Sequence, residues 1–391
     1  MIFDLDDEQR AWRDEVRAFL HEAMTPDLVA EIHELGFETF GPEQHAFWRA
    51  VGAKGWLSLT WPEEYGGLAK GPSYQQIMIN EFEYAGAHRP GLEVTSLAPM
   101  IMRYGTERNK REWLPPIARG ELIAAVGYSE PNAGTDLASL RTRAVLDGDQ
   151  WVINGQKIWN SYAHMATHEW LCVRTDPDAP KHKGISVIIV PIGTPGIEVR
   201  PLITWGDMRT NEAFFTDVRV PRTNLIGEVN KGWQYITGAL DLERGAIANA
   251  GGLRRTVDDL IATARRPLPD GRVPADDPDT RRRIAQLVCD VEIAGLMGQE
   301  SCSLLESGQI PTITVTEEKI FSSELRQRIA DTATSVLGMY GTLNGADAHA
   351  PFHGEFEQLY RDAPLMRFGG GANEVLRDSI ARRGHGLGAT R

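Results

Sequence analysis

The chain has 391 residues, of which 42% are hydrophobic and 24% are charged. This composition indicates a folded protein of two or three domains with a large core. The net charge of −13 argues against nucleic acid or an anionic membrane surface as the main partner. Cys172, Cys289 and Cys302 are too few and too scattered for a disulfide framework or a zinc site, so we expect no bound metal.

The N-terminal residues are acidic and lack an apolar signal core. No apolar run approaches the length of a membrane span. We therefore expect a cytoplasmic protein with no membrane segment.

Residues 1–122 have the pattern of a helical domain. Apolar residues recur near every 3.6 positions after residue 5, and Asp6 with Gln9 predicts a capping box at the start of this helix. Further helices are expected around Phe47, Ala50 and Val51 up to Gly55, at about 73–86 and 94–104, and from Thr106 to Gly120.

Residues 123–232 change to short apolar runs separated by Gly and Pro, which is typical of strands. Asp147-Gly148-Asp149 predicts a tight hairpin turn before Trp151. The expected strands are 123–128, 140–146, 170–174, 185–191, 197–202 and 213–220.

Residues 233–391 return to a helical period. Long helices are expected up to about residue 263 and over about 278–308, 316–340 and 372–384, packed as a four-helix bundle. The residues expected in the bundle core are Leu287, Val288, Ile293, Leu296 and Met297. The fold class is therefore α+β, with several domains.

Two segments of the β-domain carry residues suited to ligand binding. Tyr128–Asp136 is a strand end followed by a loop with hydroxyls and free backbone N–H groups, although such loops are often plain connections. In Gly155–Ser161, Trp159 and Ser161 could stack on and hydrogen-bond a flat cofactor, although a lone Trp is more often part of a core.

These two motifs, in this order and between helical domains, resemble the acyl-CoA dehydrogenase family. The resemblance extends over nearly the whole chain and includes Phe214–Pro221, Lys231–Trp233, Leu242–Arg244 and Tyr360–Ala363. It implies an N-terminal helical domain (1–122), a middle β-barrel-like domain (123–232) and a C-terminal four-helix bundle (233–391). FAD would lie between the last two.

The resemblance also implies the reaction: removal of an α-proton from an acyl-CoA thioester and hydride transfer from the β-carbon to flavin N5. Trp159 would lie against the isoalloxazine ring, with Ser161 near N5. Asp241 and Arg244 would help to fix the thioester end or the base. The residues expected to contact the ring or the CoA portion of the substrate are Tyr128, Ser129, Gly134 and Thr135.

The catalytic base is where this sequence departs from the commonest family pattern. The position that usually carries the Glu is Gly370, and Glu374 lies about one helical turn further on. In isovaleryl-type members the base comes from the position that matches Glu243. We therefore expect Glu243 to be the general base, and the Gly370 N–H to donate to the thioester carbonyl.

The segments expected to contact the adenosine half of a neighbouring subunit's FAD also differ from the pattern of homotetrameric family members. A Pro-rich loop at 265–274 replaces an Arg-aromatic-Gly pattern, and Ser335 stands where a Gln is usual. These departures resemble actinobacterial steroid-side-chain enzymes, which are α2β2 assemblies. They imply a tetramer that oxidises a bulky or branched acyl-CoA and passes electrons to an electron-transfer flavoprotein. An α2β2 assembly with a divergent partner chain is one form that this tetramer can take.

Three other readings stay open at the level of sequence. The chain could be an isovaleryl-like homotetramer acting on short branched acyl-CoAs. It could be a non-catalytic subunit that only completes a partner's site. An acyl-CoA oxidase is the third alternative.

Overall fold

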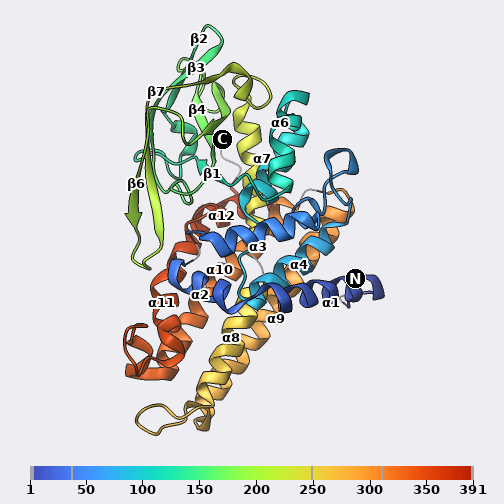
Figure 1. Cartoon of the computed structure of the whole chain (residues 1–391). Helices are drawn as coiled ribbons and strands as arrows, with labels where there is room; N and C mark the ends of the chain where they lie inside the picture. Colours follow the sequence, from blue (N-terminus) through green and yellow to red (C-terminus); the bar gives the residue numbers. More distant parts are fainter. Residues whose placement is uncertain (1–3, 37, 248–249, 310, 389–391) are drawn as a thin grey trace.

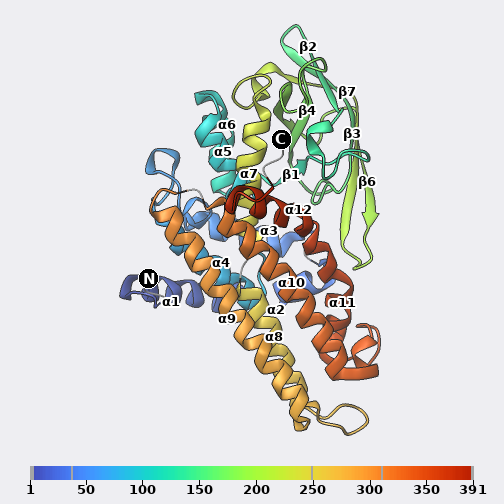
Figure 2. The ribbon, with the colours of Figure 1, turned by 180° about the vertical axis from the view of Figure 1, so that it is seen from behind.

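The computed structural model describes residues 4–36, 38–247, 250–309 and 311–388. Helices occupy both ends of the chain, with a sheet inserted between them (Figure 1). The sheet lies at one end of the molecule, and the paired helices α8 (Ala250–Ala264) and α9 (Pro278–Glu306) extend toward the opposite end (Figures 1 and 2). We retain 1–122, 123–232 and 233–391 as proposed domain limits.

The N-terminal part is helical, as predicted. Its first helix begins with the expected capping box: the Asp6 side chain accepts from the Gln9 N–H at 2.8 Å, and the Asp6 N–H donates to Gln9 Oε1 at 3.2 Å. One helix, α2, was not predicted, although Thr25 caps it and Pro26 opens it. The helices are α1 (Asp7–Ala23), α2 (Pro26–Leu35), α3 (Pro42–Ala53), α4 (Pro72–Ala85), α5 (Ala98–Tyr104) and α6 (Glu107–Ala118).

The middle part is one curled, seven-stranded sheet in the order β1-β4-β2-β3-β7-β6, with β5 paired to β4. The predicted hairpin is present, because Asp147 pairs with Gln150 across a turn in which Gly148 has φ +63°. The strands are β1 (Ala124–Gly127), β2 (Arg143–Asp147), β3 (Gln150–Lys157), β4 (His168–Arg174), β5 (Ile185–Pro191), β6 (Ile197–Ile203) and β7 (Arg209–Pro221).

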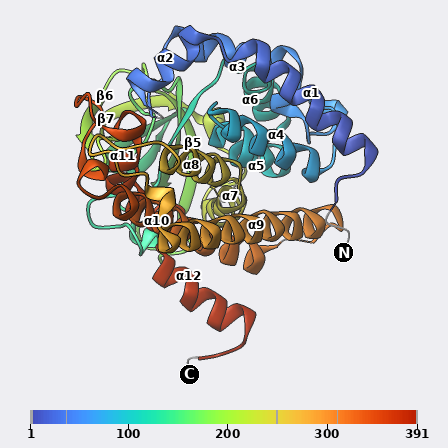
Figure 3. The same ribbon diagram turned by 90° about the horizontal axis from the view of Figure 1, so that it is seen from below.

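The C-terminal part consists of helices. Besides α8 and α9, they are α7 (Gly232–Ile247), α10 (Thr312–Leu337), α11 (Glu355–Asp362) and α12 (Asn373–Ser379). Of these, α8, α9, α10 and α11 contribute side chains to a second hydrophobic core. Figure 3 shows α12 projecting from the rest of the chain. Among the described residues, none of the helices combines the length and the apolar character needed to cross a bilayer.

The predicted core face of α9 is partly wrong. Leu287 is buried, but Val288, Ile293 and Leu296 are exposed. The buried stripe repeats every three or four residues from Leu287, so these three side chains fall outside it. The buried positions of α9 are Thr280, Ile284, Leu287, Val291, Ala294, Gly298 and Ser301.

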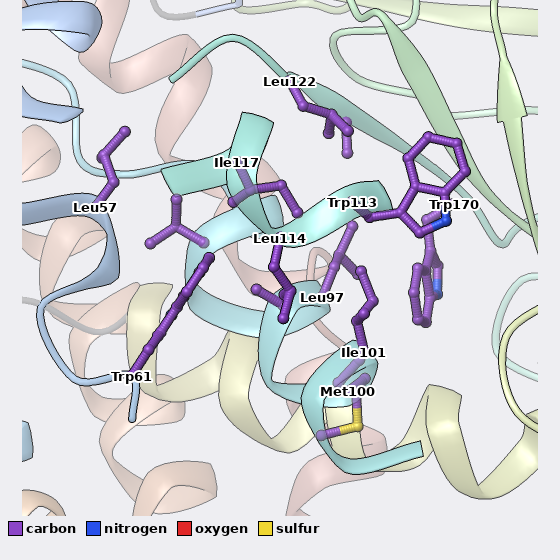
Figure 4. Close-up of a cluster of buried hydrophobic side chains, with 14 of the residues drawn as sticks. Leu57, Trp61, Leu97, Met100, Ile101, Trp113, Leu114, Ile117, Leu122 and Trp170 are labelled. Atoms are coloured by element: carbon purple, nitrogen blue, oxygen red, sulfur yellow. The ribbon is translucent and has the colours of Figure 1, made fainter. Parts of the chain in front are cut away.

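One hydrophobic core joins the three parts of the chain. It contains Trp113 of α6, Trp170 of β4 and Ile236 of α7, all buried. Figure 4 shows the indole of Trp170 beside the side chains of the N-terminal helices. Because sheet and helices share this core, the position of β1 relative to α7 is fixed by packing.

Arg361 adds a polar link between the sheet and the bundle. Its guanidinium, on α11, donates to the Trp205 carbonyl at 2.8 Å and to Asp207 at 2.5 Å, in the turn between β6 and β7. Glu357 holds the other edge of the guanidinium at 2.6 and 3.0 Å. The Tyr360-Arg361-Asp362 motif therefore anchors the β6–β7 turn on the bundle.

A buried ion pair inside the sheet gives a stability prediction. Lys157 is 0% exposed, and its Nζ is 2.9 Å from Glu130 Oε1. Lys157→Met leaves the Glu130 carboxylate buried without its cation, so we expect a loss of about 3–5 kcal/mol in the free energy of unfolding, measured with urea. Lys181→Met, which breaks the exposed pair with Asp136, is the control and should cost under about 1 kcal/mol. Equal losses in the two variants would contradict the prediction.

Candidate active site

Glu243 is a half-buried carboxylate on α7. Burial raises the pKa of Glu243 above its ordinary value, while the positive charges of Arg89, Arg244 and Lys319 act in the opposite direction. The carboxylate therefore has a proton affinity above that of an exposed Glu, with three cations nearby to limit the increase.

Arg244 connects α7 to a glycine-rich loop near the C-terminus. Its Nε donates to the Gly370 carbonyl at 3.1 Å, although the two residues are 126 positions apart. Its Nη1 donates to Asp241 at 2.6 Å, and Asp241 also accepts from the Thr312 hydroxyl at 3.2 Å. The sequence-predicted residues Asp241, Arg244 and Gly370 are thus in one hydrogen-bonded chain beside Glu243.

The glycine loop, Gly369–Gly371, has a backbone that favours glycine. Gly370 has φ +66° and Gly371 has φ +104°. In the part of the chain that the structure describes, the Gly370 N–H meets no acceptor. This loop therefore presents a backbone donor next to Arg244, with no side chain at Gly370 to cover it.

Glu374, the nearest carboxylate in sequence to Gly370, is engaged elsewhere. Its Oε1 is 3.2 Å from Arg367 Nη2, and its side chain is 66% exposed. Of the two carboxylates considered at the sequence level, Glu243 is the less exposed.

Lys319 of α10 is a buried cation that sequence reasoning missed. Its Nζ donates to the carbonyls of Arg367 and Gly371 at 3.3 and 2.8 Å and to Asn373 Oδ1 at 2.9 Å. Burial and the charge of Arg244 lower the pKa of Lys319 to about 8. A Lys within a helical sequence gives no signal of such a role, because most lysines are exposed.

On the side of the sheet, Tyr128 directly follows β1 and is buried. Burial is the main cause that raises the pKa of the Tyr128 phenol, and the charges of Cys172 and Glu243 act in the same direction. Ser129 is half-buried, whereas Gly134 and Thr135 are exposed. The loop after β1 therefore begins at a buried residue and continues into solvent.

The two predicted ligand-binding motifs lie side by side. Lys157 Nζ donates to the Tyr128 carbonyl at 3.0 Å, and the Ile158 N–H donates to the Ser129 carbonyl at 3.0 Å. Beyond this contact, Trp159 is 57% exposed and has φ +60°, a rare conformation for a bulky side chain. The half-buried Ser161 follows.

Further charged residues near the site come from the N-terminal helical part. Burial raises the pKa of Glu38 to about 7, opposed by the charge of Arg89 and a hydrogen bond with Ser161. Arg89 Nη1 is also 3.9 Å from Glu83 Oε1. No motif marks Glu38 or Arg89 in the sequence, since only the fold brings them near α7 and the sheet.

Comparison with known proteins covers almost the entire chain. Residues 6–121, 125–218 and 230–385 match the N-terminal, middle and C-terminal domains of acyl-CoA dehydrogenase, respectively. The acyl-CoA dehydrogenase FadE29 of Mycobacterium tuberculosis is 38% identical over 385 residues, 98% of each chain.

Two solved structures are similar in fold and sequence. One is the Tcur3481-Tcur3483 steroid ACAD, and the other is the ChsE4-ChsE5 complex from Mycobacterium tuberculosis. Each has a TM-score of 0.91 and 36% identity, with 100% of both chains covered. Together with the three-part fold and the residues gathered around Glu243, these matches show that the chain belongs to the acyl-CoA dehydrogenase family, whose members are FAD-dependent oxidoreductases.

Proposed function

We propose that this acyl-CoA dehydrogenase oxidises a bulky or branched acyl-CoA to its 2,3-enoyl-CoA, with Glu243 as the general base. The observation that carries the proposal is the pairing of a half-buried carboxylate, Glu243, whose pKa burial raises, with a glycine loop whose Gly370 N–H meets no acceptor among the described residues. One group removes a proton, and the other stabilises the charge that this removal creates.

Glu243 takes the α-proton of the thioester. A base works best when its pKa lies near the operating pH, and burial moves the pKa of Glu243 upward toward that range. The nearby cations keep part of the population ionised, so that the carboxylate is available to accept a proton.

The Gly370 N–H donates to the thioester carbonyl oxygen, which becomes negative as the α-proton leaves. Arg244 holds the other side of the loop by binding the Gly370 carbonyl, and Asp241 orients Arg244. In this assignment Asp241 and Arg244 act on the thioester end through the backbone of the loop.

The residues at the sheet edge fit FAD. An exposed indole such as Trp159, on a strained backbone, buries its surface when a flat ring covers it. Ser161 would hydrogen-bond near N5, and the contacts to the ring or to the CoA portion would come from Tyr128, Ser129, Gly134 and Thr135. Bound FAD supplies the acceptor for the hydride that leaves the β-carbon.

The partner and the substrate class rest on the similar structures. They are a steroid ACAD, which supports a steroid-type acyl group, and the ChsE4-ChsE5 complex, which supports an assembly of two unlike chains. In this chain Arg272, in the Pro-rich loop, donates to the carbonyls of Val336 and Leu337 at 3.1 and 3.3 Å. The segment expected to reach a neighbour's FAD is thus bound by the chain's own loop, which supports an α2β2 assembly with a divergent partner. An electron-transfer flavoprotein would reoxidise the enzyme.

The base assignment predicts the effect of Glu243→Gln, which keeps the shape of the side chain and removes its basicity. Anaerobic flavin bleaching by the preferred acyl-CoA should slow by about 10²–10⁴-fold, the usual contribution of a general base. Glu374→Gln is the matched control and should bleach at the wild-type rate. Normal bleaching by the Glu243 variant would overturn the assignment.

The pH dependence follows from the same carboxylate. Because Glu243 must be ionised to act, kcat/KM should fall as the pH decreases through its pKa, which burial places above 4.5. Removing a neighbouring cation raises this pKa further, so Arg244→Met should move the acid limb to higher pH. Both pH profiles are measured with the same acyl-CoA, so ionisation of the substrate's phosphates affects the wild type and the Arg244→Met enzyme equally. An acid limb at the same pH in both enzymes would contradict the account.

The proposed assembly predicts different flavin contents for two preparations. The chain expressed alone should purify with substoichiometric FAD and little activity, because a partner must complete the adenosine site. Co-expression with the divergent partner chain should restore both, as measured by absorbance and by bleaching with steroid-sized and short branched acyl-CoAs. A fully loaded, active homotetramer would instead favour the isovaleryl-like alternative.

A further inference from the structure

The glycine loop that carries the Gly370 N–H has little contact area of its own. Gly369, Gly370 and Gly371 have no side chains to pack, and Phe368, just before them, is 65% exposed. Glycine loses more conformational freedom on folding than any other residue type, so a run of three glycines is costly to order. A donor held only by this loop would sample many directions, unless something fixes the peptide groups.

The loop is fixed through its carbonyl groups. Arg244 binds the Gly370 carbonyl from α7, and Lys319 binds the carbonyls of Arg367 and Gly371 from α10. Lys319 therefore bridges the two ends of the loop, with one acceptor before the glycines and one at their end. Both cations hold carbonyl oxygens, and the N–H of Gly370 stays without an acceptor among the described residues.

Lys319 is itself held in place. Its third acceptor, Asn373 Oδ1, belongs to a side chain that is 0% exposed. Asn373 Nδ2 donates to Ser323 Oγ at 3.0 Å, one helical turn after Lys319 on α10. The ammonium group has three N–H donors, and in this buried site it has three acceptors, so each donor has a partner.

We propose that Lys319 is a positioning residue for the reaction: its ammonium group holds the glycine loop so that the Gly370 N–H points at the thioester carbonyl. The inference rests on the proposed function of Gly370. Lys319 does not touch the substrate in this assignment and acts on it only through the backbone of the loop. The negative charge formed on the carbonyl oxygen is then stabilised by a peptide group that two cations, Arg244 and Lys319, have oriented in advance.

The test compares Lys319→Met with Glu318→Gln. Methionine has a length similar to that of lysine but lacks the charge and the donors. Glu318, the neighbouring residue, is also buried but accepts from the Ser301 hydroxyl of α9 at 2.7 Å, so its variant controls for the change of a buried polar side chain on α10 that does not touch the glycine loop.

The first readout requires neither substrate nor flavin. Hydrogen–deuterium exchange of the peptide covering residues 366–376 should accelerate at least tenfold in Lys319→Met and stay unchanged in Glu318→Gln. Unchanged exchange in Lys319→Met would overturn the proposal, because the loop would then be held without the lysine.

The second readout is the infrared band of an enoyl-CoA labelled with ¹³C at the thioester carbonyl. Binding to the wild type, loaded with FAD, should shift this band to lower frequency, and the shift should be smaller in Lys319→Met. The value of kcat should fall by about 10–100-fold with KM within about threefold, as is usual for a partner that orients a functional group. A full shift in Lys319→Met would contradict the role of the lysine.

Two further outcomes separate this proposal from the one on which it rests. If the wild type binds enoyl-CoA without a carbonyl shift, the role of Gly370 is wrong, and the role of Lys319 falls with it. If Lys319→Met does not fold, Asn373→Ser removes one acceptor of the lysine and keeps the cation. The proposal then requires faster loop exchange and a smaller carbonyl shift in that variant, and is overturned if both are as in the wild type.

Discussion

The hydrogen bond from Arg244 Nε to the Gly370 carbonyl joins α7 to a loop 126 residues later in the chain, and the rest of the site depends on it. Glu243, the proposed base, is the residue just before Arg244, so the same contact ties the helix that carries it to the loop. Hydrogen bonds from charged donors stabilise a structure by about 1.5–3 kcal/mol each, and here Asp241 and Lys319 add more of them around the same loop. The loop with the proposed carbonyl-binding donor is thus held by groups on the helix of the proposed base and on α10.

The sheet meets this network through packing rather than through charge. Trp170 of β4 and Ile236 of α7 belong to one core, and Tyr128 lies close enough to Glu243 for the carboxylate to affect its phenol. Arg361 fastens the β6–β7 turn to α11. Because both links are rigid, the distance between Trp159 and the glycine loop is set by the fold.

Much of the fold could be predicted from local patterns. The capping box at Asp6, the hairpin turn at Asp147–Asp149 and the change of period after residue 122 are short-range signals, and each has its expected structure. The buried face of α9 was wrong at Val288, Ile293 and Leu296, because apolar character alone does not decide which side of a helix has a neighbour.

The residues of the candidate site also fall into two groups, those that sequence motifs indicate and those that they do not. Glu243, Gly370 and Trp159 stood in segments that resemble a family, so their positions could be proposed before the fold was known. Lys319, Glu38 and Arg89 lie in ordinary helical or loop sequence, and only long-range packing brings them near the site. No spacing in the sequence indicates that a lysine will bind the carbonyls of a loop 48 and 52 positions away.

The central claim, that Glu243 takes the α-proton, is tested most directly without the redox step. A 3,3-dimethylacyl-CoA, whose β-carbon carries two methyl groups and a further alkyl group, has no β-hydrogen to lose, so proton removal alone leads to exchange at the α-carbon. In D₂O the FAD-loaded enzyme should incorporate deuterium at that carbon, as measured by mass spectrometry, and the Glu243→Gln enzyme should not. Deuterium incorporation at the wild-type rate by the variant would show that another group is the base.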